Sequence, residues 1–114
     1  KYKKDSLAAE SQFQIADIFL NDVKDYELAI SEFKKVLESY SDYSVSKKSL
    51  FMIAYINNNY INSYSEAFKY YNLFIEKYPN DELIPSVNYE LNGLNKLQNE
   101  IDSLNNVINR KENI

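Results

Sequence analysis

The sequence predicts an all-α protein, an α-solenoid of antiparallel helix pairs that repeat every 38 residues. Three observations predict this class. The apolar residues of 64–78 recur at helical spacing, the same spacing occurs 38 residues earlier, and the helix before each of these segments repeats at the same offset. Two helices in a unit of about this length are typical of solenoids, whose neighbouring units stack to bury a shared core.

The second helix of each unit has one apolar face. Between residues 64 and 78 the apolar side chains fall at steps of 3, 1, 3, 3, 1 and 3, as on an amphipathic helix. These side chains belong to Tyr64, Ala67, Phe68, Tyr71, Phe74, Ile75 and Tyr78. Ser63 and Ser65 are candidate N-caps, and Pro79 is expected to stop the helix. The earlier copy consists of Tyr26, Ala29, Ile30, Phe33, Val36, Leu37 and Tyr40.

The first helix of each unit repeats as well. Segments 10–47 and 48–85 share ten identities at this offset. The pairs that place the first helix are Phe13/Phe51, Ile15/Ile53, Ala16/Ala54, Ile18/Ile56 and Asn21/Asn59. A third copy of the first helix begins at the same 38-residue offset, with Tyr89, Leu91 and Leu94 in the places of Phe51, Ile53 and Ile56. We therefore predict a single domain over residues 1–109, with a first repeat at about 6–43 and a second at about 46–81.

A long helix is predicted after the second repeat, over about 84–109. Its apolar residues fall at steps of 4, 3, 3, 4, 3 and 4, and they are Val87, Leu91, Leu94, Leu97, Ile101, Leu104 and Ile108. One interpretation is a capping helix that covers the exposed apolar face of the second repeat. In the alternative, Leu97, Ile101, Leu104 and Ile108 form a coiled coil with a second chain, which gives a homo-oligomer. Residues 110–114 are a polar tail that we expect to fray.

The composition excludes several classes of function. The net charge of −4 is spread along the chain, which argues against a nucleic-acid partner. No window approaches the roughly 18 to 20 apolar residues of a membrane span, so this segment is not expected to insert into a membrane. The chain has no Cys and no His, and one Gly cannot build a phosphate loop. The carboxylate pairs Asp22/Asp25 and Asp81/Glu82 are expected in interhelix loops, in cap or turn roles. We therefore predict no enzyme activity, catalytic residue, cofactor or metal site.

The small and aromatic residues of both units resemble the tetratricopeptide repeat family. That family has a small residue late in the first helix, another early in the second, an aromatic four positions on, and a proline after the second helix. Ala16, Ala29 and Phe33 fit the first unit, and Ala54, Ala67, Tyr71 and Pro79 fit the second. The chain departs from the family by lacking its Trp-Leu-Gly opening. Its units also exceed the usual 34 residues, and the extra residues are expected in loops at 21–25 and 57–63.

The stretch Phe74-Ile75-Glu76-Lys77-Tyr78-Pro79-Asn80 is similar to the bacterial envelope branch of this family. That branch includes BamD-like outer-membrane assembly lipoproteins and the Tol-Pal accessory proteins. The resemblance implies a non-catalytic protein–protein interaction scaffold in a cell-envelope assembly complex, periplasmic or outer-membrane-associated, with the cytoplasm as the alternative. The chain begins at Lys1 without an initiating Met, so we expect a processed protein or a fragment, and any export signal or lipid anchor would lie upstream.

The resemblance also implies where a partner binds, because the first helices of this family line a concave surface. The candidate residues for contact with a peptide or partner protein are Phe13, Asp17, Asn21, Phe51, Tyr55, Asn58, Asn59 and Tyr89. Asparagine side chains both donate and accept hydrogen bonds, so they can pair with an extended peptide backbone. It is equally open that Asn57–Asn59 only end a helix. The alternative function is a structural protein that assembles into dimers or filaments through the repeat ends or the C-terminal helix.

Overall fold

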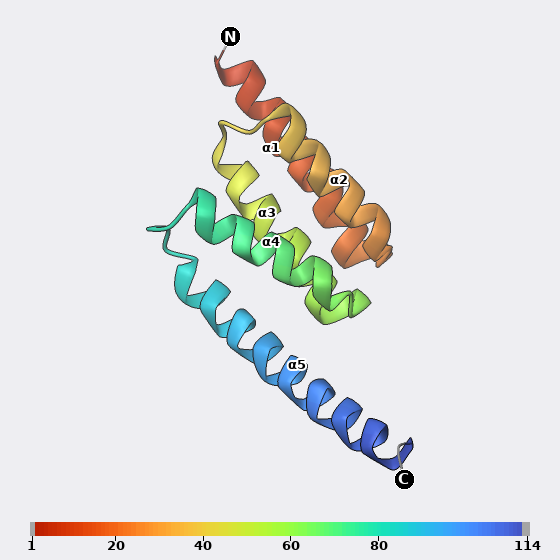
Figure 1. The fold of residues 1–114 in the computed structure, drawn as a ribbon. Coiled ribbons are helices and arrows are strands. Elements are labelled where there is room, and N and C mark those ends of the chain that lie inside the picture. The colour runs from red at the N-terminus through yellow and green to blue at the C-terminus, as the bar shows by residue number, and fades with distance from the viewer. Residues whose placement is uncertain (1, 113–114) are drawn as a thin grey trace.

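The chain folds into successive antiparallel helices (Figure 1). The computed structural model describes residues 2–112, with the side chains of residues 5–111. The described part is 87% helical and contains no strand, which confirms the predicted all-α class. Its α-helices are α1 (Tyr2–Ile18), α2 (Tyr26–Ser39), α3 (Ser44–Ile56), α4 (Tyr64–Lys77) and α5 (Ile84–Glu112).

Each helix packs against the next one along the chain, and α1 also touches α3. In Figure 1, α1 and α3 form one layer and α2 and α4 form a second layer in front of it. The molecule is therefore elongated, with extents of 69 × 33 × 19 Å. This stacking of two tetratricopeptide-like helix pairs is the predicted α-solenoid. Within residues 2–112, no helix is both long enough and apolar enough to cross a bilayer.

The small residues of both units lie at the closest helix contacts. Ala16, Ala29, Ala54 and Ala67 have no exposed surface. The first two pack in one cluster with Phe33, Ile53 and Ile56, whereas the other two pack in a second cluster with Leu50, Tyr71 and Phe74. A methyl group at these positions allows neighbouring helices to approach, and the aromatic ring one turn later fills the space between them.

Each first helix ends in a π-helical turn, η1 (Phe19–Val23) after α1 and η2 (Asn57–Ile61) after α3. The next residue, Lys24 or Asn62, adopts a left-handed conformation with a φ of 61°. Its backbone N–H donates to the carbonyl of Phe19 or Asn57, respectively, and thereby closes the turn. Two residues then suffice to connect the helices. The expected longer loops at 21–25 and 57–63 are therefore wrong, because the chain stays helical through most of both segments.

The caps of the second helices come from these short connections. Asp25 is the N-cap of α2, and its Oδ1 accepts a hydrogen bond of 3.1 Å from the backbone N–H of Leu28. Ser63 occupies the same position before α4, whereas Ser65 lies inside that helix. Asp81 lies just before α5 and accepts a hydrogen bond of 2.9 Å from the backbone N–H of Leu83.

Helix α5 covers the second repeat with its first half only. Val87, Leu91 and Leu94 are buried against the cluster that contains Tyr71 and Phe74. From residue 98 to 111 every side chain is exposed, and the helix extends past the other helices (Figure 1). The helix continues through residues 110–112, which were expected to fray, and residues 113–114 of the predicted tail lie outside the described residues.

Candidate functional site: an aromatic groove between α3 and α5

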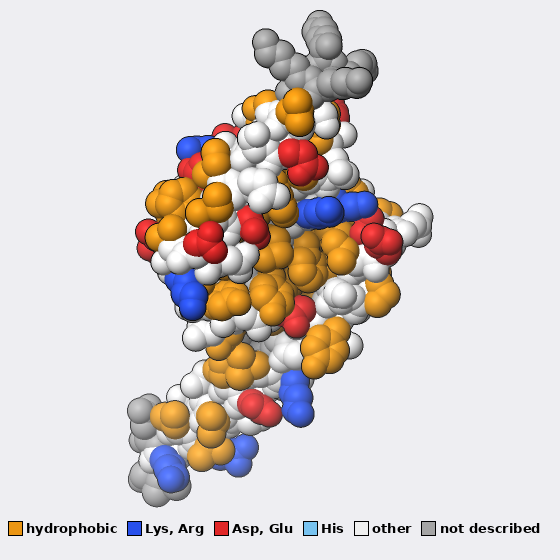
Figure 2. All heavy atoms as spheres, turned by 180° about the vertical axis from the view of Figure 1, so that it is seen from behind, with side chains coloured by type: hydrophobic (Ala, Val, Ile, Leu, Met, Phe, Trp, Pro, Cys, Tyr) orange, Lys and Arg blue, Asp and Glu red, His pale blue; other side chains and the backbone are white. Residues whose placement is uncertain are grey.

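An open groove of about 380 Å³ lies between α3 and the start of α5. Its lining residues are Phe51 and Tyr55 from α3 and Pro85, Ser86, Tyr89 and Glu90 from α5. Figure 2 views the molecule from the side of α1 and α3 and shows hydrophobic side chains gathered at the centre of this face, with charged side chains around them. Tyr89 is 77% exposed, so its ring is available to a partner.

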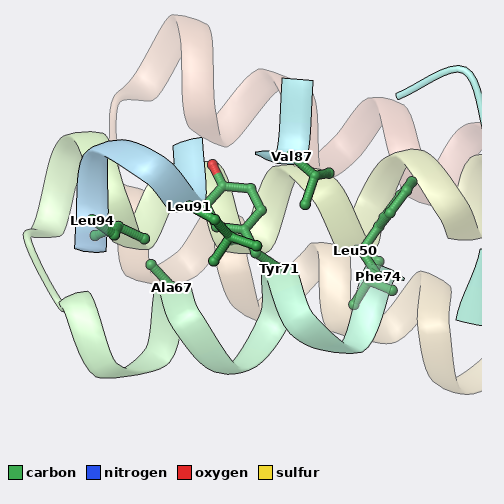
Figure 3. Packing of buried hydrophobic residues seen from close by; sticks show 8 residues of the cluster. Leu50, Ala67, Tyr71, Phe74, Val87, Leu91 and Leu94 are labelled. Carbon is green, nitrogen blue, oxygen red and sulfur yellow. The ribbon is translucent and has the colours of Figure 1, made fainter. Parts of the chain in front are cut away.

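The groove has an aromatic floor that is tied to the core. Phe51 and Tyr55 are four residues apart on α3, and their rings stack with centroids 6.0 Å apart. Phe51 also makes edge contacts with Tyr71 and Phe74 of α4, at 5.9 and 6.3 Å. Figure 3 shows Tyr71 and Phe74 in the packing beneath α5. Because Tyr71 and Phe74 are fully buried, the floor is held in position before any partner arrives.

A single carboxylate joins the three elements around the groove. Oε1 of Glu90 accepts hydrogen bonds from Asn58 Nδ2 at 3.0 Å, Asn59 Nδ2 at 2.9 Å and the Tyr71 hydroxyl at 3.1 Å. Burial raises the pKa of Tyr71 well above its ordinary value, and the nearby charge of Glu90 raises that pKa further. The hydroxyl therefore keeps its proton and remains a donor to Glu90 at any physiological pH.

The three consecutive asparagines have different roles. Asn57 is buried and donates to the carbonyl of Ile53 at 2.9 Å, at the point where α3 continues into η2. Asn59 also donates to the carbonyl of Tyr55 at 3.1 Å. Asn59 thus donates two hydrogen bonds within the molecule and Asn58 donates one to Glu90, so the oxygens of both amides are the groups left for pairing with a peptide backbone.

The candidate residues of the first repeat lie elsewhere. Phe13 packs its ring edge-on against Phe33, with centroids 5.4 Å apart. Asp17 accepts a hydrogen bond of 2.9 Å from Asn21 on the surface of α1 and η1. Phe13, Asp17 and Asn21 do not line the groove between α3 and α5. Of the eight candidates, Phe51, Tyr55 and Tyr89 line the groove, and Asn58 and Asn59 hold Glu90 at its border.

Sequence reasoning missed Glu90, Pro85 and Ser86. The repeat gave no signal for Glu90, because the same register position holds the polar Gln14 in the first unit and Met52 in the second. The aromatic surface also extends beyond the predicted set. Tyr60 lies 6.2 Å from Tyr55 and stacks on Tyr26 at 4.6 Å, centroid to centroid.

The second half of α5 presents a separate apolar stripe. Leu97 is half-buried, whereas Ile101, Leu104 and Ile108 are 37%, 63% and 52% exposed. All four were the candidate residues for self-association. They continue the line of Val87, Leu91 and Leu94, which is buried in the first half of the same helix. Among the described side chains, no three acidic residues converge so as to hold a metal ion.

Comparison with known proteins identifies the family. No curated protein and no solved structure matches the chain at a significant level. A family model described as the tetratricopeptide repeat matches residues 10–43 and 48–81, and only residues 44–47 lie between the two matches. Such repeats are generally non-catalytic scaffolds and commonly mediate protein–protein interaction. Because the matches cover more than half of the chain and coincide with its two helix pairs, the chain belongs to the tetratricopeptide repeat family.

Proposed function

We propose that the chain is a non-catalytic scaffold that binds an extended segment of a partner protein in the groove between α3 and α5. The observation that carries this proposal is the solvent-open aromatic surface of Phe51, Tyr55 and Tyr89. Tyrosine rings combine a large apolar area with a hydroxyl that can still pair, so they anchor many protein interfaces. Burial of this surface by a partner would contribute to affinity through the hydrophobic effect.

The groove is suited to binding because its walls are already ordered. Tyr71 and Phe74 support the floor from α4, and Glu90 links α5 to η2 and α4. A partner therefore loses its own freedom on binding, while the scaffold loses little. Such preorganisation lowers the entropic cost of association.

Site-specific crosslinking tests this proposal. A photoreactive amino acid is placed at Tyr89, at Asn72 on the exposed face of α4, or at Leu104 on α5, in the organism that encodes the protein. We expect a discrete crosslinked partner from position 89 and none from position 72. The same products from 89 and 72, or products from 104 only, would reject the groove as the binding site.

Tyr89→Ala is the matched loss-of-binding variant. Its side chain makes no hydrogen bond to the described residues and is mostly exposed, so the stability change should stay within about 0.5 kcal/mol. Asn58→Ala would be less informative, because it removes one of the three donors to Glu90. Lys69→Ala, on the exposed face of α4, serves as the control that should leave the crosslinked partner in place.

We further propose that this scaffold works in the bacterial cell envelope, as part of an assembly complex. The support is the similarity of residues 74–80 to the envelope branch of the family. Fractionation of cells expressing the full-length protein tests the location, together with protease access in spheroplasts. We expect the protein in the periplasmic or outer-membrane fraction. Recovery with a cytosolic marker would favour the cytoplasmic alternative.

A second candidate function, self-assembly, is favoured by the exposed stripe of α5. Leu97, Ile101, Leu104 and Ile108 alternate at steps of 4, 3 and 4, which is the spacing of a two-chain coiled coil. Sedimentation at several concentrations tests whether a second copy covers the stripe. Self-assembly predicts a mass that rises with concentration and falls to the monomer in Leu104→Ser/Ile108→Ser. Asn99→Ser should not change it, and a monomer at all concentrations excludes this function.

A further inference from the structure

Glu90 carries a charge that its own hydrogen bonds do not require. Its three donors, the amides of Asn58 and Asn59 and the hydroxyl of Tyr71, are all neutral. The amide oxygen of a glutamine could accept the same three bonds. Lys35 forms an ion pair with Glu32, and Lys47 forms one with Asp81. Among the side chains that the structure describes, no lysine or arginine forms an ion pair with Glu90. A negative charge thus lies at the groove without a counterion.

The position of Glu90 makes this charge available to a ligand. The residue is half-buried, and it borders both the aromatic groove and an adjoining hollow lined by Asn58, Tyr89 and Leu94. All three hydrogen bonds end on Oε1, and Oε2 accepts none from the described side chains. Lys96 borders the adjoining hollow but does not pair with Glu90. A partly desolvated carboxylate gains most from a partner that brings a cation.

We propose that the bound segment places a lysine side chain in the groove, with its ammonium on Oε2 of Glu90 and its methylene stem along Phe51, Tyr55 and Tyr89. This inference rests on the proposed function, since it names the chemistry of the partner at the same groove. Lysine stems pack on apolar surface while the charged end remains polar, and ammonium groups are attracted to aromatic faces.

The geometry favours lysine over arginine. A guanidinium binds a carboxylate best with two parallel bonds, one to each oxygen, and Oε1 of Glu90 already accepts three. An ammonium needs only the single free oxygen. The net charge of −4 adds a weak attraction for a basic segment at longer range, and this attraction should fall with added salt.

Four pools of short peptides test the inference directly by fluorescence polarisation with the whole chain. The pools share randomised flanks and differ only at the central residue, which is Lys, Arg, Gln or Glu. We expect the Lys pool to bind most tightly and the Glu pool most weakly, with about tenfold or more between the Lys and Gln pools. Equal binding of all four pools, or no binding by any, overturns the inference.

The decisive variant is Glu90→Gln, which retains an oxygen for the three donors. We expect it to bind the Lys and Gln pools equally, whereas Glu100→Gln, an equal charge change on the exposed half of α5, should keep the preference for Lys. A preference that survives Glu90→Gln, or is lost in both variants, rejects Glu90 as the lysine site. If Tyr89→Ala weakens every pool and all pools bind equally to the unmodified chain, the groove stands and only the lysine inference fails. Loss of the fold in Glu90→Gln would still leave the comparison of pools on the unmodified chain as a full test.

Discussion

At the residue scale, Ala67 shows how little room the helix contacts leave. It has no exposed surface and lies among Leu50, Tyr71 and Leu91, at the contact between α4 and its neighbours (Figure 3). Ala67→Leu inserts extra carbon atoms into this contact, so we expect a loss of roughly 1 to 3 kcal/mol in the free energy of unfolding. Urea denaturation measures the loss. Asn72→Leu, on the exposed face of the same helix, should change stability by no more than about 0.5 kcal/mol, and equal values for both would disprove the close contact.

Another residue pair ties the end of the second unit to its beginning. Lys47 Nζ at the start of α3 lies 2.5 Å from Asp81 Oδ1, and the N–H of Leu83 donates to the same carboxylate. The hydrogen bond from Lys47 and then the one from Leu83 lower the pKa of Asp81 below its ordinary value of 3.8. A lowered folded-state pKa contributes stability that is present above the unfolded pKa and is lost as the pH falls through the folded pKa. The contribution is therefore complete at neutral pH, begins to decline as the pH approaches 3.8, and is lost only below the lowered pKa of the folded state.

This linkage predicts the acid behaviour of a variant. Lys47→Met removes the main cause of the lowered pKa, so the midpoint of acid unfolding should move to higher pH. Helix content followed by circular dichroism between neutral and strongly acidic pH measures the shift. Glu32 stays acid-sensitive in the variant, because Lys35 and Gln12 lower its pKa independently. The exposed neighbour Lys48→Met is the control, and the same shift in both variants would show a general charge effect instead.

At the scale of elements, the two π-helical turns lead each first helix into the second helix of its pair. Both end in a left-handed residue, but Lys24 occupies this conformation in the first turn and Asn62 in the second. The conformation costs a residue with a β-carbon roughly 1 to 2 kcal/mol, and Asn tolerates it better than Lys. The first turn is therefore the more strained of two otherwise equivalent elements.

Glycine at these positions should relieve the strain unequally. Lys24→Gly should raise the free energy of unfolding by up to about 1 kcal/mol, since glycine's greater freedom in the unfolded chain offsets part of the relief. Asn62→Gly should give a smaller gain or none. Paired thermal melts of the two variants provide the measurement. A Lys24→Gly protein that is clearly less stable than the parent would show that the lysine side chain stabilises the turn by other contacts.

At the scale of the whole molecule, α5 has two halves with different environments. Leu91 in the first half is buried in the cluster of the second repeat, whereas Leu104 in the second half is 63% exposed. Because each solenoid unit contacts only its neighbours, the covered end contributes to stability and the projecting end does not. The first half thus belongs to the fold, and the second half presents its apolar stripe to solvent.

Alanine substitution separates the two halves. Leu91→Ala should cost about 2 to 5 kcal/mol, because it leaves a cavity under the helix. Leu104→Ala should change the stability of a monomer by no more than about 0.5 kcal/mol. Denaturation at low and high protein concentration provides the measurement. A large effect of Leu104→Ala that appears only at high concentration would indicate that a second copy covers the stripe.

Several features followed from residue spacing because they depend on neighbours along the chain. The Ala-to-aromatic interval of Ala29/Phe33 and Ala67/Tyr71 predicted the buried positions, since helical periodicity decides which side chains share a face. Phe51, Tyr55 and Tyr89 were placed on first helices by the same reasoning, and their role in binding stays a prediction. The π-helical turns were missed, because the residues beyond the usual unit length were assigned to loops, whereas a π-turn takes up an extra residue within the helix.

By itself, the sequence determined the all-α class, the 38-residue unit and the buried alanines, because the residue spacing that predicts them occurs twice within the chain. Only the tertiary structure decided that α5 leaves the solenoid halfway, and that Glu90 meets Asn58, Asn59 and Tyr71. Those donors lie 32, 31 and 19 residues before Glu90 in the sequence. The spacing of residues along the chain determines which face of a helix is apolar. The packing of the helices in space determines which polar groups share a groove, and it leaves the charge of Glu90 without a counterion.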